Sequence, residues 1–212
     1  MNLKPLKPKL FNKKENYYRV HHDEEDAVQI LSAKIAEMIP SKSPRPIAIV
    51  NIGTDRSTGD SLGPLIGTFL QEKAPANFHV YGTLDDPVHA VNLDEKLTHI
   101  KKDLVMPYII GIDACLGRLK SVGVITLGEG PVKPGAGVNK ELPDVGDIHL
   151  TGIVNVSGFM EFFVLQNTRL SLVMKMARSI ADSLYEADQI IQKKKNMERL
   201  QLKSRMAARS VK

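Results

Sequence analysis

The fold class is decided by the stretch Ile47–Gly53, which reads Ile-Ala-Ile-Val-Asn-Ile-Gly. A continuous apolar run of this kind, ended by a glycine, is typical of a strand buried on both faces of a sheet. A second such run occupies residues 106–113. Because amphipathic helical patterns lie between the apolar runs, the sequence predicts an α/β fold. We expect a three-layer sandwich with a mainly parallel, mixed sheet between helices.

The remaining elements follow from the same periodicities. Acidic residues at positions 23–26 predict the start of the first helix, because they complement its N-terminal dipole. Residues 128–147 are rich in Gly and Pro and predict a long loop or hairpin, with an extended piece around Lys133–Val138. The other predicted elements are helices near 62–70, 89–102 and 159–166 and from about 168 onward, and strands at 78–83, 122–127 and 148–156. In the last helix one apolar stripe contains Leu170, Val173, Ala177, Ile180, Leu184 and Ile191.

The charge distribution divides the chain into three parts. Residues 1–22 carry six basic and one acidic side chain, and residues 192–212 carry eight and one. The segment between them has 15 basic and 22 acidic side chains, so the net charge of +5 comes from the ends. We therefore expect a flexible basic arm over 1–22, a single α/β domain over 23–191 and a basic helical extension or tail over 192–212.

The composition of the chain limits the functional classes to which the protein can belong. The basic ends are able to contact nucleic acid, but no aromatic residues interleave with them, and solvated surface is the favoured explanation. One cysteine in 212 residues excludes a disulfide framework and a thiolate zinc cluster. The sequence shows no secretion signal and no apolar stretch long enough to span a membrane, which predicts a cytoplasmic protein. The oligomeric state stays open.

Two carboxylates stand where predicted strands end. Asp60 follows the first apolar run within a glycine-rich loop, and Asp113 ends the second. Functional groups of open α/β sheets collect beyond the carboxyl ends of their strands. Taken singly, Asp60 has a plainer explanation as a helix N-terminal acid and Asp113 as a turn residue. Taken together they indicate a site, because two close carboxylates share a proton as acid and base or hold a divalent metal.

The glycine loop does not fit a nucleotide site. It lacks the Gly-Lys-Ser/Thr of a P-loop, and its glycines do not follow the spacing of a dinucleotide-binding turn. Asp60 also brings a negative charge to the place where a phosphate would bind. We therefore do not expect nucleotide binding.

The stretches Asn51–Pro64 and Gly111–Gly117 resemble a known group of proteins. They are similar to those of the hydrogenase maturation endopeptidases and of the germination protease of endospore-forming bacteria. They most closely resemble the YyaC family of spore protease-like proteins. The resemblance extends over about residues 46–187. It implies the phosphorylase/hydrolase-like sandwich of the hydrogenase maturation protease type and a site of the peptidase kind.

The resemblance also implies roles for individual residues. The maturation endopeptidases gather two acids and a histidine that precedes a Gly-x-x-Glu helix at a metal-sensing site. The two acids correspond to Asp60 and Asp113, which also match the proposed catalytic pair of the germination protease. Gly158 and Glu161 fit the third motif, but Asn155 stands where the histidine is expected. Because an amide oxygen is a poorer nickel ligand than imidazole, Asn155 argues against nickel at this site. Whether Asp60 and Asp113 hold another divalent metal stays open.

Other polar residues near these motifs are weaker candidates. His149 lies in the strand before Asn155 and is able to act as a substitute ligand or proton carrier, although an ordinary strand histidine is the favoured explanation. Asp55 and Arg56 lie in the glycine loop, where they pair with each other, bind a peptide backbone or, slightly favoured, are simply solvated. Cys115 has no nearby base in the sequence and is better explained as a small buried apolar residue.

From these observations we expect a sporulation-associated peptidase of the cytoplasm, or of the forespore or spore interior, that acts on a protein or peptide. Asp60 and Asp113 are expected to activate water for attack on the peptide carbonyl, with Asp55, Arg56, Asn155 and His149 as accessory or substrate-binding residues. The alternative is a catalytically inactive protein of the same fold that binds a peptide or protein.

Overall fold

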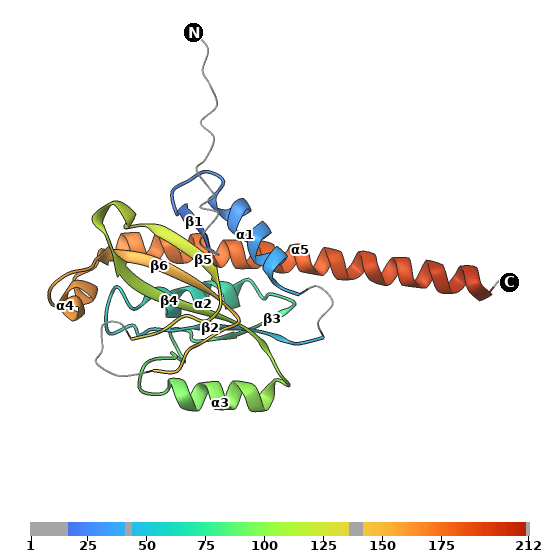
Figure 1. Cartoon of the computed structure of the whole chain (residues 1–212), viewed down its shortest axis with the longest axis horizontal. Helices are drawn as coiled ribbons and strands as arrows, with labels where there is room; N and C mark the ends of the chain where they lie inside the picture. The colour runs from blue at the N-terminus through green and yellow to red at the C-terminus, as the bar shows by residue number, and fades with distance from the viewer. Residues whose placement is uncertain (1–16, 41–43, 136–141, 211–212) are drawn as a thin grey trace, which may run out of the picture.

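A computed structural model describes residues 17–40, 44–135 and 142–210 of the chain. Six strands form one mixed sheet in the order β1-β5-β6-β4-β2-β3. The expected α/β sandwich is confirmed, because helices lie on both faces of this sheet (Figure 1). The elements in chain order are β1 (Tyr17–His21), α1 (Ala27–Met38), β2 (Ile47–Asn51), α2 (Leu62–Glu72), β3 (Phe78–Tyr81), α3 (Leu93–Asp103), β4 (Tyr108–Gly117), the 3₁₀ turn η1 (Leu119–Ser121), β5 (Val124–Glu129), β6 (Ile148–Val156), α4 (Glu161–Gln166) and α5 (Leu170–Ser210).

The parallel part of the sheet contains the strands that the sequence marks most strongly. Strands β3, β2, β4 and β6 run parallel to one another, and β2 is buried along its whole length, as a strand covered on both faces must be. Strand β5 pairs with β6 in the antiparallel direction. The carboxyl ends of the four parallel strands therefore meet at one edge of the sheet, which we call the carboxyl edge.

The prediction for the N-terminal arm is wrong over residues 17–22. Residues 17–21 form β1, which pairs antiparallel with β5 at the edge of the sheet, and His22 continues into the next turn. The folded domain therefore begins at Tyr17 at the latest, whereas the sequence placed its start at position 23. Only Val20 of this strand is buried, which explains why its sequence carries little strand signal. Residues 1–16 lie outside the described residues.

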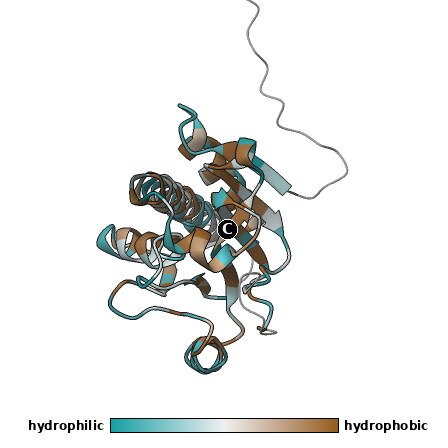
Figure 2. Ribbon diagram, turned by 90° about the vertical axis from the view of Figure 1, so that its left-hand side faces the viewer, coloured by the Kyte–Doolittle hydropathy of each residue, from teal (hydrophilic) through white to brown (hydrophobic). Residues whose placement is uncertain are grey.

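The two faces of the sheet have separate apolar cores. Helices α1, α2 and α5 cover one face, and Figure 1 shows α3 on the other side. The smaller core joins Leu93, Leu97 and Ile100 of α3 to residues of β2 and β4. In Figure 2 the hydrophobic colour concentrates where helices pack on the sheet. Among the described helices, α3 alone packs in this smaller core, so it covers the β2 side of that face, and no described helix packs on the β5 side.

The last helix, α5, is continuous over 41 residues. Its predicted stripe is buried from Val173 to Ile191, but Leu170 is 56% exposed. Beyond Ile191 the described side chains are exposed or nearly so, and the helix projects from the domain (Figure 1), so the basic C-terminal part is helical up to Ser210. None of the helices within the described parts of the chain has both the length and the apolar character needed to cross a bilayer.

Several boundaries differ from the sequence prediction. Helix α1 begins at Ala27, after turns over residues 23–26, and α3 begins at Leu93. In the long glycine-rich connection, Val132 pairs with Val145 in an isolated bridge, while residues 136–141 of the predicted extended piece lie outside the described residues. Strand β4 does not stop at Asp113 but continues to Gly117.

Candidate active site

The glycine loop, residues 53–61, folds over the carboxyl edge directly after β2. Its start is fixed by two backbone hydrogen bonds: Ile52 N–H donates to the Ile112 carbonyl (2.7 Å) and Gly53 N–H to the Val88 carbonyl (2.8 Å). The loop then turns back, and Thr54 N–H donates to the Asp60 carbonyl (3.1 Å). A Cβ at Gly53, where φ is +149°, would clash with that same carbonyl. Glycine at position 53 is therefore what allows Asp60 to lie beside the end of β2.

Asp60 lies two residues before α2, where the helix dipole favours a negative charge. Its side chain is partly buried, and this burial raises the pKa of the carboxyl group. The Ser57 hydroxyl acts in the opposite direction and favours the ionised form. Ser57 is buried and its hydroxyl makes no hydrogen bond at standard geometry, so we regard this as a weak interaction. Asp60 is thus a carboxyl group whose affinity for a proton is higher than in water.

Asp113 lies on β4 immediately past the last residue paired with β2, because the register ends at Asn51 opposite Ile112. Burial raises the pKa of Asp113 to about 8. The Ala114 N–H donates to Oδ1 of Asp113 (2.9 Å) and lowers the pKa, whereas the negative charge of Asp60 raises it. At neutral pH the Asp113 carboxyl group is therefore mainly protonated.

The negative charge of Asp60 raises the pKa of Asp113, so the two carboxyl groups interact electrostatically. The pKa of Asp113 is raised further than that of Asp60. The two carboxyl groups therefore differ in proton affinity, and Asp113 keeps its proton to the higher pH. Such a pair, one carboxylic acid and one carboxylate, is suited to general acid–base chemistry on a bound water.

Asn155 has a structural role in place of the accessory role that the sequence suggested. Its side-chain NH₂ donates to the Val164 carbonyl (3.2 Å) and to the Thr168 hydroxyl (3.2 Å), and its Oδ1 accepts from Val156 N–H (2.8 Å). These bonds tie the end of β6 to α4 and to the residues before α5. Both amide hydrogens are therefore used within the fold, and the amide oxygen already accepts one hydrogen bond.

The other accessory candidates lie around the pair. Asp55 and Arg56 are exposed on the glycine loop, where Arg56 N–H donates to the Thr54 hydroxyl (3.3 Å). His149 is opposite Gly111 in the register, one side-chain row before Asp113, and its Nδ1 lies 3.0 Å from the Gly130 carbonyl oxygen. Asp55 and Arg56 share the glycine loop with Asp60, and His149 lies one row from Asp113 on the sheet. None of the three has a hydrogen bond to either acid among the described residues.

Cys115 and Thr151 are additional side chains on this part of the sheet. Thr151 is opposite Asp113 in the register. Thr151 was not identified as a candidate from the sequence, in which the alternation of side chains along β6 is the only pattern that could have indicated it. Burial raises the pKa of the Cys115 thiol to about 11, although a hydrogen bond with Thr151 lowers it. The thiol is therefore protonated at neutral pH, and Cys115 is not an activated nucleophile.

The donor set fits a divalent metal poorly. Asp60 and Asp113 supply two carboxyl groups, and among the described residues no third His, Cys or carboxylate ligand atom is grouped with them. Within the described residues, the group with metal-ligand spacing is His21, His22 and Asp23, at the end of β1 and apart from the pair. We therefore describe the chemistry of the site through protons alone.

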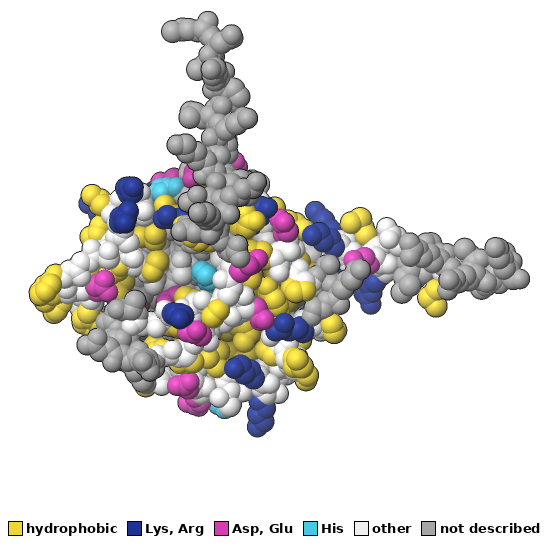
Figure 3. Space-filling model, in the orientation of Figure 1, with side chains coloured by type: hydrophobic (Ala, Val, Ile, Leu, Met, Phe, Trp, Pro, Cys, Tyr) yellow, Lys and Arg dark blue, Asp and Glu magenta, His cyan; other side chains and the backbone are white. Residues whose placement is uncertain are grey.

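Exposed apolar side chains flank the glycine loop. Helix α4 is held against the loop by the Gly59 N–H, which donates to the Leu165 carbonyl (2.9 Å). The apolar patch on and before α4 consists of Phe159, Met160, Phe162 and Phe163, which are between 52% and 94% exposed. Figure 3 shows hydrophobic side chains at the end of the molecule where Figure 1 places α4. An exposed apolar patch beside a polar site is typical of a surface that contacts another polypeptide.

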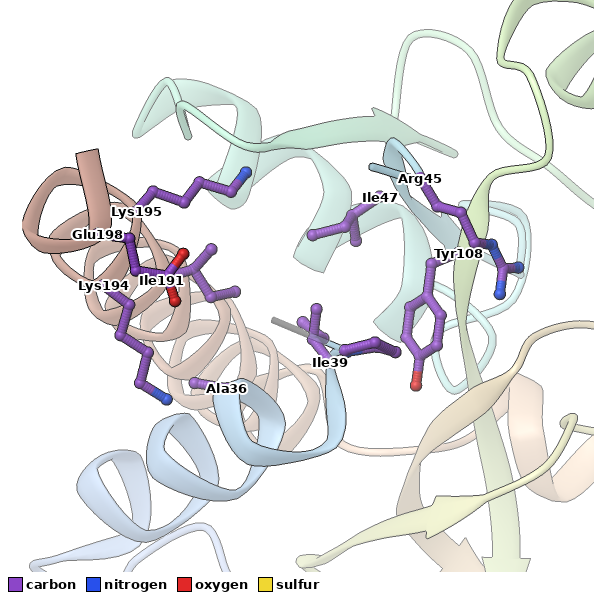
Figure 4. Close-up of a pocket in the computed structure, with 10 residues that line it drawn as sticks. Ala36, Ile39, Arg45, Ile47, Tyr108, Ile191, Lys194, Lys195 and Glu198 are labelled. Carbon is purple, nitrogen blue, oxygen red and sulfur yellow. The ribbon is translucent and has the colours of Figure 1, made fainter. Parts of the chain in front are cut away.

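A pocket at the opposite edge of the sheet is distinct from this site (Figure 4). It is lined by the starts of β2 and β4, the end of α1 and the projecting part of α5. Two of its polar side chains are engaged within the fold: Arg45 donates to the Pro107 carbonyl and to Asp147, and the Tyr108 hydroxyl to the Met38 carbonyl. The paired acids therefore remain the candidate site.

Comparisons with known proteins place this geometry in a family. A family model described as "Protein of unknown function (DUF1256)" matches residues 19–183. The uncharacterized protein YyaC of Bacillus subtilis (strain 168) is 53% identical over 180 residues, which cover 84% of this chain and 88% of that protein. The [NiFe] hydrogenase maturation protease HycI from Thermococcus kodakarensis KOD1 aligns structurally at 15% identity and a TM-score of 0.47 over 74% of this chain and 99% of that one. A likeness at that level carries no functional argument.

Proposed function

We propose that this chain, which belongs to the DUF1256 family, is a peptidase that hydrolyses peptide bonds with the Asp60–Asp113 pair. The description of that family assigns no function. The proposal is carried by the position of the two acids at the carboxyl edge, where burial and the charge of Asp60 raise the pKa of Asp113 to about 8. A carboxyl group kept protonated beside a second carboxylate is the arrangement that acid–base hydrolysis requires.

The two acids have different tasks in this mechanism. The Asp60 carboxylate accepts a proton from a water molecule, whose oxygen attacks the carbonyl carbon of the peptide. Protonated Asp113 donates its proton to the carbonyl oxygen as the C–O bond forms. When the tetrahedral intermediate breaks its C–N bond, the leaving nitrogen takes the proton held by Asp60, and Asp113 recovers a proton from the hydroxyl group.

A polypeptide substrate is supported by the apolar patch on and before α4. Aromatic side chains more than half exposed to water are unfavourable unless a partner covers them at some stage. The patch adjoins the glycine loop that carries Asp60, so an extended segment that reaches the acids is able to contact it. The resemblance of the Asn51–Pro64 motif to spore proteases supports a role in the cytoplasm or forespore of a sporulating cell.

A binding protein without activity is the second candidate. It is favoured by Asn155, which stands at the position of the third ligand in the maturation endopeptidases and whose amide is used internally. Such a protein would hold a peptide at the carboxyl edge without breaking it. The distinction between the two candidates therefore depends on whether Asp60 and Asp113 turn a substrate over.

Cleavage of defined proteins tests the proposal. The full chain is incubated with a mixture of small basic proteins and with a peptide library, with and without a chelator, and products are identified by mass spectrometry. We expect cleavage that survives the chelator and is lost in Asp60→Asn and in Asp113→Asn. The control is Asp103→Asn, an exposed acid at the end of α3 that should leave cleavage unchanged. Cleavage at the wild-type rate in both site variants would discard the assignment.

A further inference from the structure

A row of polar side chains crosses the sheet from β1 to β4. The strand register places Arg19 opposite Thr126, Thr126 opposite Thr151, and Thr151 opposite Asp113. Their neighbours along each strand, such as Val20, Leu150 and Ile112, are buried in the core under α1, α2 and α5. Because side chains alternate between the two faces of a sheet, the four residues of the row lie on the opposite face, which is the face of α3.

This row is accessible along its length. The core of α3 involves β2 and the first part of β4, and it contains no residue of β1, β5 or β6. Arg19 is exposed, and Thr126, Thr151 and Asp113 are half-buried. Val20, Leu150 and Ile112, which face the other side of the sheet, are buried. The described residues therefore form a continuous polar strip that leads from the paired acids to the edge strand β1.

Arg19 gives the strip a positive end. It forms no salt bridge with any carboxylate among the described residues. Its positive charge acts on Cys115 of β4 and lowers the pKa of that thiol, so its electrostatic effect extends across the strip. An unpaired guanidinium has the geometry to bind a carboxylate through two parallel hydrogen bonds.

We propose that this strip binds the substrate in an extended conformation, with a substrate carboxylate at Arg19 about four residues from the bond that is cleaved. The spacing follows from the sheet: three steps of ~4.8 Å between strands give about 14 Å, and an extended chain advances about 3.3–3.6 Å per residue. The threonine hydroxyls between the two ends are able to donate to and accept from the peptide backbone. This inference rests on the proposed peptidase function and adds a substrate class, peptides with a negative charge at a defined distance.

Peptides with a movable charge test the proposal. One series of decapeptides carries Glu, Gln or Lys at two to six residues on either side of the cleaved bond, and each member is made with a free and with an amidated C-terminus. The free and amidated forms distinguish a terminal carboxylate from an acidic side chain. Cleavage rates are compared for the wild type, Arg19→Gln, Arg19→Glu and the control Lys101→Glu, an exposed cation on α3.

The expected result is a preference for Glu, or for the free C-terminus, about four residues from the cleaved bond. An exposed ion pair is worth a factor of about two to five, so Arg19→Gln should reduce kcat/KM for the charged peptide by that factor. Arg19→Glu should reverse the preference toward Lys, and Lys101→Glu should retain the wild-type preference. An unchanged preference in both Arg19 variants would overturn the inference while leaving the peptidase function intact.

A binding measurement distinguishes the inference about Arg19 from the proposed peptidase function. If no peptide is cleaved, the peptidase function fails. Fluorescence anisotropy with the same peptides, labelled at the uncharged end, still measures their affinity for the polar strip. Tighter binding of the charged peptide that is lost in Arg19→Gln would support the inference. Equal binding of Glu, Gln and Lys peptides to the wild type would overturn it.

Discussion

The substitution Asp113→Asn tests the physical basis of the site most directly. The carboxyl group has a pKa of about 8 in the folded protein against 3.8 for an ordinary aspartate. Below pH 3.8 both the folded and the unfolded chain hold the proton, and this group does not affect stability. Between pH 3.8 and 8 the folded chain holds a proton that the unfolded chain has lost, so the free energy of unfolding falls as the pH rises. Asparagine is neutral at every pH and removes this loss.

The magnitude follows from the size of the shift. About four pKa units at about 1.4 kcal/mol each set an upper bound of about 6 kcal/mol on the cost of ionised Asp113. The side chain is partly exposed and its surroundings relax on ionisation, so we expect Asp113→Asn to be more stable than the wild type by about 1–3 kcal/mol at pH 8.5. The asparagine Oδ1 still accepts from Ala114 N–H, so the local backbone keeps its partner.

Urea unfolding at pH 4, 6 and 8.5 provides the measurement. The difference between Asp113→Asn and the wild type should be near zero at pH 4 and should grow with pH. Asp103→Asn controls for the general effect of removing one surface charge, and its difference should change little with pH. The reasoning about burial would be refuted by a variant that gains no stability at pH 8.5, or by a gain that is equally large at pH 4.

Two further predictions concern the mechanism and the loop. The rate of peptide cleavage should show a bell-shaped pH dependence. It should fall above about pH 8 as Asp113 loses its proton, and in acid as Asp60, whose pKa is also raised, becomes protonated. A rate that still rises at pH 10 would contradict the assigned roles. Gly63→Ala should lower the free energy of unfolding by about 3 kcal/mol, because the new methyl group would clash with the Ile52 carbonyl under the glycine loop. Gly158→Ala, which meets no atom within 4 Å, is the matched control and should change it by less than about 0.5 kcal/mol in urea unfolding.

The sequence predicts the central strands and helices well, because their burial produces a local periodicity of apolar residues. Strand β6 has the predicted bounds, Ile148–Val156, and β2 ends one residue earlier than the apolar run suggests. Helix α2 follows the glycine loop as its amphipathic pattern requires. The same loop already marks Asp60 in the sequence, since functional side chains are often carried by loops at the ends of buried strands.

Strand β1 and Asn155 show where local pattern fails. One of the five residues of β1 is buried, so its sequence resembles a polar arm, and only pairing with β5 makes it a strand. Asn155 occupies a position that a motif assigns to a site, and its side chain also hydrogen-bonds to Val164 of α4 and to Thr168 before α5. Both outcomes depend on partners distant in the chain or in a neighbouring element.

By itself the amino-acid sequence determined the class of fold, the elements from the first helix onward and the two acids at or after buried apolar runs. Only the tertiary structure decided that β5 lies beside β6 and β1 beside β5, and hence that Arg19, Thr126, Thr151 and Asp113 share one row. The physical reason is the range of the interactions. The alternation of apolar and polar residues records which side of a strand is buried, whereas the choice of neighbouring strand is made by backbone hydrogen bonds and packing between segments far apart in the chain.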